Sequence, residues 1–291
     1  MSTALVNRIV ALIRDTSSSL PPDVLKALRA AQRKERKGSS AAVVLKTILD
    51  NCAIAAKRGT PLCQDTGTLT FFVDEKLRSK VTPAVIGKAV AIATEKGYLR
   101  KNTIDAVSGK SYDDNCALGA PVIHYASAPS SLVPRPSSLT LILKGGGSEN
   151  MSRQYSLPDA SLGAGRDLEG VRKCVLDAVQ KIQGYGCAPG ILGVCIGGDR
   201  ATGYEVAKEQ LLRPLDEAEG RERREEGRGV IPKLEKRLLK EANGLGIGPM
   251  GLGGKTTLLG VKIAARPRVP ASFFVTVAYM CWACRRRSSE V

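Results

Sequence analysis

Apolar residues recur three and four positions apart over the first 57 residues, and this spacing predicts successive amphipathic helices. The first predicted helix covers about residues 1–20. A second begins at Pro21 and Pro22, since proline suits the first turn of a helix, and a third follows a serine cap at Ser39. We therefore expect residues 1–57 to form a helical N-terminal segment.

Beyond this segment, predicted strands and helices alternate along the chain. The predicted strands read TLTFFV, PVIHYAS, SLTLIL, GILGVCIGG, GVKIAA and ASFFVTVAYMCW, and the predicted helices read TPAVIGKAVAIATEKGYLRKN, LEGVRKCVLDAVQKIQGYG and ATGYEVAKEQLLR. Such alternation is typical of an α/β fold with a largely buried sheet. We predict a single large domain over residues 1–291, with a mixed β-sheet flanked by helices.

Two further segments bear on this organisation. Residues 213–243 are rich in charge and have helical propensity, which favours a solvated helix over a hinge or a partner surface. The apolar run PASFFVTVAYMCWAC is too short to cross a bilayer and rich in β-branched and aromatic residues, so it predicts a buried strand. Arg8 and Arg14 interrupt the N-terminal apolar pattern, and we expect a cytoplasmic protein without a membrane span.

Charge is the strongest signal in the composition. The 291 residues carry a formal net charge of +16, which leaves open a nucleic-acid footprint or a solvated surface that steers an anionic substrate. The basic runs RAAQRKERKG and GRERREEGRG contain glutamates or adjoin loop residues, which favours the second interpretation. An aromatic content of 4% also argues against a stacking platform for single-stranded nucleic acid.

The eight cysteines favour metal or redox roles over a disulfide framework, because the chain is long and lacks a secretory signal. Cys63, Cys187 and Cys281 lie in LCQDTGT, GCAPG and YMCWACRR, which are unlike ordinary core sequence. Three thiolates without an obvious fourth are what an iron–sulfur cluster with one open iron requires. The remaining cysteines outside CWAC lie in apolar or mixed surroundings and are expected to be structural: Cys52, Cys116, Cys174 and Cys195.

Other motifs give weaker indications. The string KGGGSEN at residues 144–150 follows a strand, and its glycines allow backbone amides to approach an anion. The glycine-rich segment near residue 250 follows a helix instead of a strand, which disfavours a dinucleotide site, and GGKTT has Pro249 where a phosphate-binding loop requires its first glycine. The only histidine, His124, is expected to be a hydrogen-bonded core residue.

Five strings together resemble the iron–sulfur class I fumarases and the related L-tartrate dehydratases, in their N-terminal half or α subunit. They are LCQDTGT, KGGGSENMS, GILGVCIGGDRATG, LGIGPMGLGGKTT and PASFFVTVAYMCWACRR, and they occur in family order. The resemblance covers about residues 40 to 287 and implies a hydro-lyase that interconverts fumarate and malate, or one that dehydrates tartrate.

The resemblance also implies a ligand set and a substrate site. It places a 4Fe-4S cluster on Cys63, Cys187 and Cys281 and leaves Cys284 as a non-ligand. Gln64 and Asp65 beside the first ligand would contact substrate, with Asp65 handling a proton. Gly146 would offer its backbone to substrate, and Arg100 would clamp a substrate carboxylate. A β-type subunit carrying the second half of the active site is the expected partner in an oligomer.

The chain departs from the family pattern at two places. Val269 stands where the family commonly has a histidine in substrate contact, and SYDDN at residues 111–115 replaces an N-T-x-D-N string. Two alternatives of another class therefore stay open: a basic nucleic-acid-binding protein and a non-catalytic regulatory subunit on the same scaffold.

Overall fold

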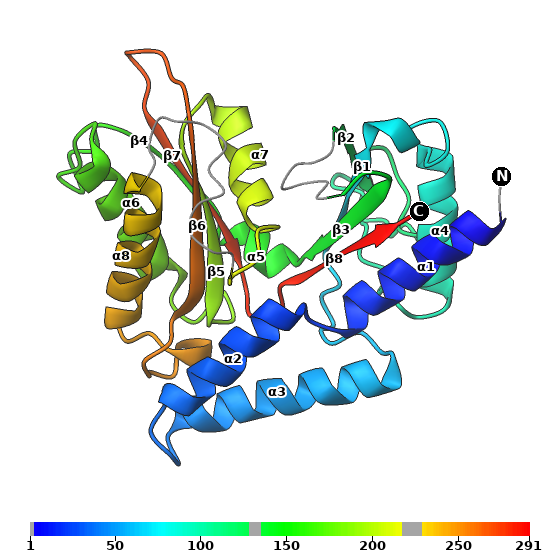
Figure 1. Ribbon diagram of the computed structural model, residues 1–291, viewed down its shortest axis with the longest axis horizontal. Helices are drawn as coiled ribbons and strands as arrows, with labels where there is room; N and C mark the ends of the chain where they lie inside the picture. The colour runs from blue at the N-terminus through cyan, green and yellow to red at the C-terminus, as the bar shows by residue number, and fades with distance from the viewer. Residues whose placement is uncertain (1–2, 128–134, 217–228) are drawn as a thin grey trace. The chain divides into compact units, whose positions relative to one another are not determined.

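The computed structural model describes residues 3–127, 135–216 and 229–291, and these contain eight α-helices and eight strands (Figure 1). The helices are α1 (Thr3–Ser18), α2 (Pro22–Lys34), α3 (Ser40–Arg58), α4 (Pro83–Glu95), α5 (Gly146–Asn150), α6 (Leu168–Ile182), α7 (Arg200–Gln210) and α8 (Val230–Gly244). The strands are β1 (Thr68–Asp74), β2 (Val122–Ala126), β3 (Ser138–Lys144), β4 (Arg153–Ser156), β5 (Gly190–Gly197), β6 (Leu258–Arg266), β7 (Phe274–Met280) and β8 (Arg285–Glu290). No helix in the described part of the chain is both long and apolar enough to cross a membrane.

The α/β class, the mixed sheets and the helical N-terminal segment are confirmed, but the described residues form two four-stranded sheets. It divides into two compact units, with unit 1 comprising residues 1–22, 48–146 and 283–291 and unit 2 comprising residues 23–47 and 147–282. The sheet of unit 1 has the order β2-β1-β3-β8, and that of unit 2 has the order β4-β7-β5-β6. Each sheet contains one parallel pair, β1 with β2 and β5 with β6, and its other pairs are antiparallel.

Unit 1 buries its core between its sheet and the helices α1 and α4. Alternate residues of β1 and β3, such as Phe71 and Leu141, are fully buried with Ile9 and Ile13 of α1. The helix α4 begins where the sequence predicts, because the Thr82 hydroxyl accepts a hydrogen bond from Val85 N at 3.4 Å and Pro83 fills the first turn.

Unit 2 places α6 and α8 on one face of its sheet and α7 on the other (Figure 1). The buried residues of α6 recur at helical spacing, from Val171 to Ile182, and pack with alternate residues of β5 and β7. The opposite face is lined by small residues that allow α7 to approach closely. A Cβ built on Gly193 of β5 would lie 2.0 Å from the backbone oxygen of Ala207 in α7.

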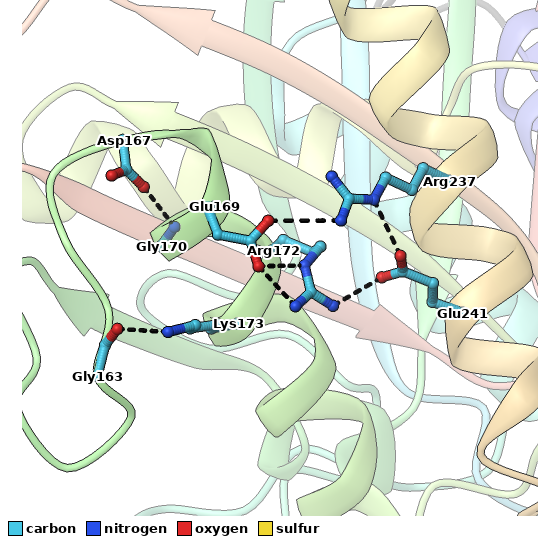
Figure 2. A network of polar contacts seen from close by, with 8 residues as sticks. All are labelled: Gly163, Asp167, Glu169, Gly170, Arg172, Lys173, Arg237 and Glu241. Carbon is cyan, nitrogen blue, oxygen red and sulfur yellow. Dashed lines mark hydrogen bonds and ion pairs between the residues drawn. The ribbon is translucent and has the colours of Figure 1, made fainter.

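An ion-pair network joins α6 to α8 along their partly exposed sides (Figure 2). Arg172 donates to Glu169 with an Nε–Oε1 distance of 2.7 Å and to Glu241 with an Nη1–Oε2 distance of 2.9 Å. Arg237 donates to the same two glutamates, at 3.4 and 2.9 Å. Because each arginine bridges both carboxylates, the network fixes the pairing of the two helices more firmly than isolated surface pairs would.

Several predictions about single segments are corrected by the structure. The helix in residues 213–243 covers only Val230–Gly244, because Arg213–Asp216 are not helical, and residues 217–228, with most of the predicted basic run, lie outside the described residues. This helix is not merely solvated, since Leu234 and Leu238 enter the core. His124 is exposed and stacks on Phe72 at 5.1 Å, so the expectation of a core histidine is wrong.

We expect Gly193→Ala to destabilise unit 2 by about 1–3 kcal/mol, because the added methyl must push α7 away from the sheet. The free energy of unfolding from urea denaturation is the measurement. Gly244→Ala is the matched control, since its new methyl would meet no atom within 4 Å. Equal stability of the two variants would show that α7 does not pack at this distance.

Candidate functional site

Cys187 and Cys281 lie at the same end of the sheet of unit 2 because of strand pairing. The strands β5 and β7 are antiparallel with Ile191 opposite Met280, so the residues before β5 and after β7 leave the sheet at one end. The two segments are joined directly, since Trp282 N donates to Cys187 O at 3.3 Å. Cys187 is exposed and Cys281 is half-buried.

Serine hydroxyls hold the end of β7 that carries Cys281. The neighbouring strand β4 begins at Arg153, opposite Val277, so the ladder ends before Tyr279 and Cys281. Tyr279 N then donates to the Ser152 hydroxyl at 3.2 Å, and Cys281 N donates to the Ser148 hydroxyl at 3.1 Å. These serines belong to the string GGGSENMS, which therefore fixes the backbone of a candidate ligand.

The loop that carries Cys187 has an unusual backbone. Cys187 has φ of 52°, in the left-handed region that a residue with a side chain rarely adopts, at a cost of roughly 1 kcal/mol. The loop is held there by Cys187 N donating to Gly184 O at 3.3 Å and by Met250 N donating to Ala188 O at 2.9 Å. The glycine-rich segment near residue 250 thus supports the Cys187 loop instead of opening a helix at a nucleotide.

The ring of Tyr279 lies beneath the same loop. A Cβ on Gly186 would lie 2.5 Å from its Cε1, and a Cβ on Gly190 would lie 2.4 Å from its hydroxyl oxygen. Tyr279 is 1% exposed, and its hydroxyl has no hydrogen-bond partner among the described residues. Burial, together with the nearby Cys281 and Cys187, raises the pKa of Tyr279 well above its usual value. An unsatisfied buried hydroxyl costs about 1–3 kcal/mol, so its presence at this position needs an explanation.

Cys63 and the other predicted site residues belong to unit 1. Cys63 and Asp65 are half-buried, whereas Gln64, Arg100 and Gly146 are exposed. Cys63, Gln64 and Asp65 occupy the loop between α3 and β1.

Close backbone contact brings this loop beside the glycine string of unit 1. Gly67 has φ of 75°, and a Cβ there would lie 2.4 Å from the backbone of Lys144, so only glycine fits. A Cβ on Gly146 would lie 3.9 Å from Oδ2 of Asp65. The predicted substrate residues Asp65 and Gly146 are therefore neighbours.

A buried asparagine organises the backbone around Arg100. The Asn115 side chain accepts from Asn102 N and Thr103 N at 2.8 and 3.0 Å and donates to Arg100 O at 2.9 Å. Arg100 N in turn donates to the Thr66 hydroxyl at 3.2 Å, which ties the arginine segment to the loop of Asp65. Asn115 is the last residue of SYDDN, and the family string N-T-x-D-N also ends in asparagine. The chain therefore keeps the residue that holds this backbone, although it differs earlier in the string.

Arg285 places a buried guanidinium beneath the Asp65 loop. It is 1% exposed, and its Nη2 donates to Asp65 O at 2.7 Å. Nε and Nη1 have no partner among the described residues. Arg285 was not among the residues predicted from the sequence, although an arginine directly after a buried apolar run is a visible signal.

The remaining cysteines differ from the candidate ligands. All eight lie within the described residues, and none forms a disulfide. Burial raises the pKa of Cys52 to about 11, of Cys174 to about 12 and of Cys195 to about 11, which disfavours their thiolate forms. Cys284 is fully buried, and Cys116 is half-buried with its sulfur 3.4 Å from Gly87 O. These surroundings fit structural thiols.

Within each unit, taken over the described residues, no three His, Cys, Asp or Glu side chains converge as a metal site. Cys187 and Cys281 lie in unit 2 at one sheet end, and Cys63 lies in unit 1. The donor chemistry fits an iron–sulfur group, because thiolates are its usual ligands and the buried Tyr279 hydroxyl has no hydrogen-bond partner in the part of the chain that the structure describes.

The structure is that of an α/β protein that carries candidate sulfur ligands on loops at the ends of its strands. Comparison with known proteins gives the family: residues 6–290 match the family model described as fumarate hydratase (fumerase). This chain belongs to the fumarate hydratase family, as the sequence motifs indicated.

Two relatives represent the two branches that the motifs resemble. A Geobacillus stearothermophilus protein named "Putative fumarate hydratase class I" is 46% identical over 283 residues, which cover 94% of this chain and 52% of the relative. The L(+)-tartrate dehydratase subunit alpha of Escherichia coli K12 is 30% identical over 290 residues, which cover 98% of this chain and 88% of the relative. The chain thus spans about half of the first relative and most of the second.

We expect Asn115→Ala to destabilise unit 1 by about 2–4 kcal/mol, because it removes a buried side chain that holds the partly buried backbone groups of Arg100, Asn102 and Thr103 with three hydrogen bonds. Urea denaturation measures the loss, and protease sensitivity near Arg100 reports the loosened segment. Asp113→Ala serves as the control, since the Asp113 side chain is 79% exposed and should cost less than about 0.5 kcal/mol. Equal effects in both variants would contradict the role given to Asn115.

Proposed function

We propose that this chain is the α-type half of a cluster-dependent hydro-lyase that interconverts fumarate and malate. The observation that carries the proposal is the convergence of Cys187 and Cys281 at one sheet end in a member of the fumarate hydratase family. The domain of this activity would comprise residues 1–291.

The proposed ligands of a 4Fe-4S cluster are Cys63, Cys187 and Cys281, with Cys284 excluded because its sulfur is buried. When bound, a cluster with three thiolate ligands supplies an open Lewis-acidic iron that polarises a substrate hydroxyl as a leaving group. The exposure of Cys187 and the half-burial of Cys63 and Cys281 support this choice.

The substrate residues would act from unit 1. Asp65 is proposed to move the proton next to the substrate carboxylate, supported by the position of its carboxylate beside Gly145 and Gly146. Arg100 would bind a carboxylate of the substrate in bidentate geometry, and its exposed side chain is available for this. Gln64 and the Gly146 backbone would complete the contacts.

The buried Arg285 supports the substrate chemistry through electrostatics. A positive charge beneath the Asp65 loop attracts dianionic substrate toward this part of unit 1, in the same sense as the net charge of +16. It also fixes the backbone that carries Asp65, since the guanidinium donates to the Asp65 carbonyl.

The working enzyme is proposed to be a cytoplasmic oligomer with a β-type partner that carries the rest of the active site. Two observations support this partner: the E. coli relative is named as an alpha subunit, and the Geobacillus relative is about twice as long as this chain. Val269 is 65% exposed, so the proposed partner would be able to contact the chain at this position.

L-tartrate dehydration is the second candidate function. The E. coli relative, which this chain matches over almost its whole length, is named for that activity. Both substrates are dicarboxylates that lose water from a hydroxyl-bearing carbon, so the same residues could serve either one.

The proposed function is tested by turnover of malate, fumarate and L-tartrate under anaerobic conditions, with and without a β-type partner. We expect fumarate and malate to interconvert only when cluster-loaded chain and partner are both present. Removing the cluster with an iron chelator should abolish the activity. A loaded complex that turns over only L-tartrate would favour the second candidate, and one that turns over none of the three would refute the hydro-lyase proposal.

Replacing Cys63, Cys187 or Cys281 by serine should each reduce bound iron and sulfide to background after anaerobic reconstitution, because three thiolates are the minimum set. Iron and sulfide assays and the visible absorbance of the cluster are the measurements. Cys284→Ala is the matched control and should retain a full cluster. The reverse pattern, with Cys281→Ser loaded and Cys284→Ala empty, would assign the third ligand to Cys284.

A further inference from the structure

The position of the Tyr279 hydroxyl suggests a function beyond packing. Tyr279 is the penultimate residue of β7, two residues before Cys281, and its ring points under the loop of Cys187. Its hydroxyl oxygen lies against Gly190, where the loop of Cys187 meets β5, because an added Cβ on Gly190 would approach it to 2.4 Å. The exposed residue of this loop is Cys187.

The ring of Tyr279 explains why positions 186 and 190 are glycine. Gly186 and Gly190 are both buried and not in the left-handed region, so their backbone conformation does not by itself require glycine. Any side chain would collide with the phenol, because a Cβ on Gly186 would lie only 2.5 Å from Cε1 and one on Gly190 only 2.3 Å from Cε2. The loop therefore packs against the ring at both of its ends, which brings the phenol next to the segment that carries Cys187.

The hydroxyl is nevertheless unused by the protein. It has no partner among the described residues, although the backbone N–H of the same tyrosine is bonded to Ser152. A core position that needs only an aromatic ring is normally filled by phenylalanine, since a buried hydroxyl without an acceptor is unfavourable. A bound group that supplies an acceptor would satisfy the Tyr279 hydroxyl and remove this cost.

We propose that the Tyr279 hydroxyl donates a hydrogen bond to sulfur at Cys187 in the cluster-loaded protein, either to the thiolate or to a neighbouring sulfide. This inference rests on the proposed function, because the acceptor is part of the cluster. Tyr279 is a positioning residue that stabilises negative charge on sulfur and raises the reduction potential of the cluster, since hydrogen bonds to sulfur set that potential.

The test compares Tyr279→Phe with the wild-type chain after anaerobic reconstitution. The variant loses only an oxygen that has no partner in the described ranges, so we expect native circular dichroism and full iron and sulfide content. We expect the midpoint potential, followed by electron paramagnetic resonance during a redox titration, to shift to more negative values. Exposure to air should then bleach the visible absorbance several-fold faster than in wild type.

Tyr155→Phe is the matched control in the same unit. Its hydroxyl has a protein partner, Asp177, at 2.7 Å, so the change should lower stability without moving the cluster potential. Resonance Raman spectra of wild-type protein in heavy water provide a measurement that does not depend on the variant folding. A deuterium shift of the iron–sulfur stretching bands is expected.

The outcomes separate the two proposals. A loaded Tyr279→Phe protein with unchanged potential and unchanged air sensitivity would overturn the role of Tyr279 and leave the hydro-lyase proposal intact. Raman bands of wild type that do not respond to deuterium would do the same. A wild-type chain that assembles no cluster would overturn both.

Discussion

The antiparallel pairing of β5 and β7 is the constraint on which the thiol site of unit 2 depends. Cys187 and Cys281 are 94 residues apart by their numbering, yet the register of Ile191 with Met280 brings their segments to one sheet end. Each strand is buried on both faces, so the pairing is fixed by the cores on either side. A register shift by one residue would move every side chain of β7 to the wrong face.

The long helices and buried strands could be predicted from sequence because their apolar periodicity is a local signal. β8 could not, since its sequence RRRSSE has no strand pattern, and only its pairing with β3 makes it one. The short strand β4 and helix α5 depend in the same way on their neighbours. His124 was misjudged because an apolar run around it indicates a core strand, whereas the side chain lies on the exposed face.

The candidate site shows the same division. The cysteines and the Asp65 loop were visible in the sequence as unusual strings, and the family comparison agrees with the resemblance that they suggested. The supporting contacts were not visible, because Ser148, Ser152 and Asn115 act on residues distant in the chain or in non-repeating loops. Side-chain hydrogen bonds of this kind carry no periodicity. Their assignment requires the fold, and the ligand set and substrate residues stay predictions until the cluster and turnover are measured.

The charged character of β8 has a consequence for how the protein behaves in solution. It is an edge strand of the unit 1 sheet, in the order β2-β1-β3-β8, and it carries the half-buried Arg286 and Arg287 after the buried Arg285. An edge of bare backbone groups invites pairing with a like strand of another molecule, and repeated positive charge makes that pairing repulsive. The arginine-rich sequence of β8, which does not resemble a strand, therefore also disfavours aggregation through this edge.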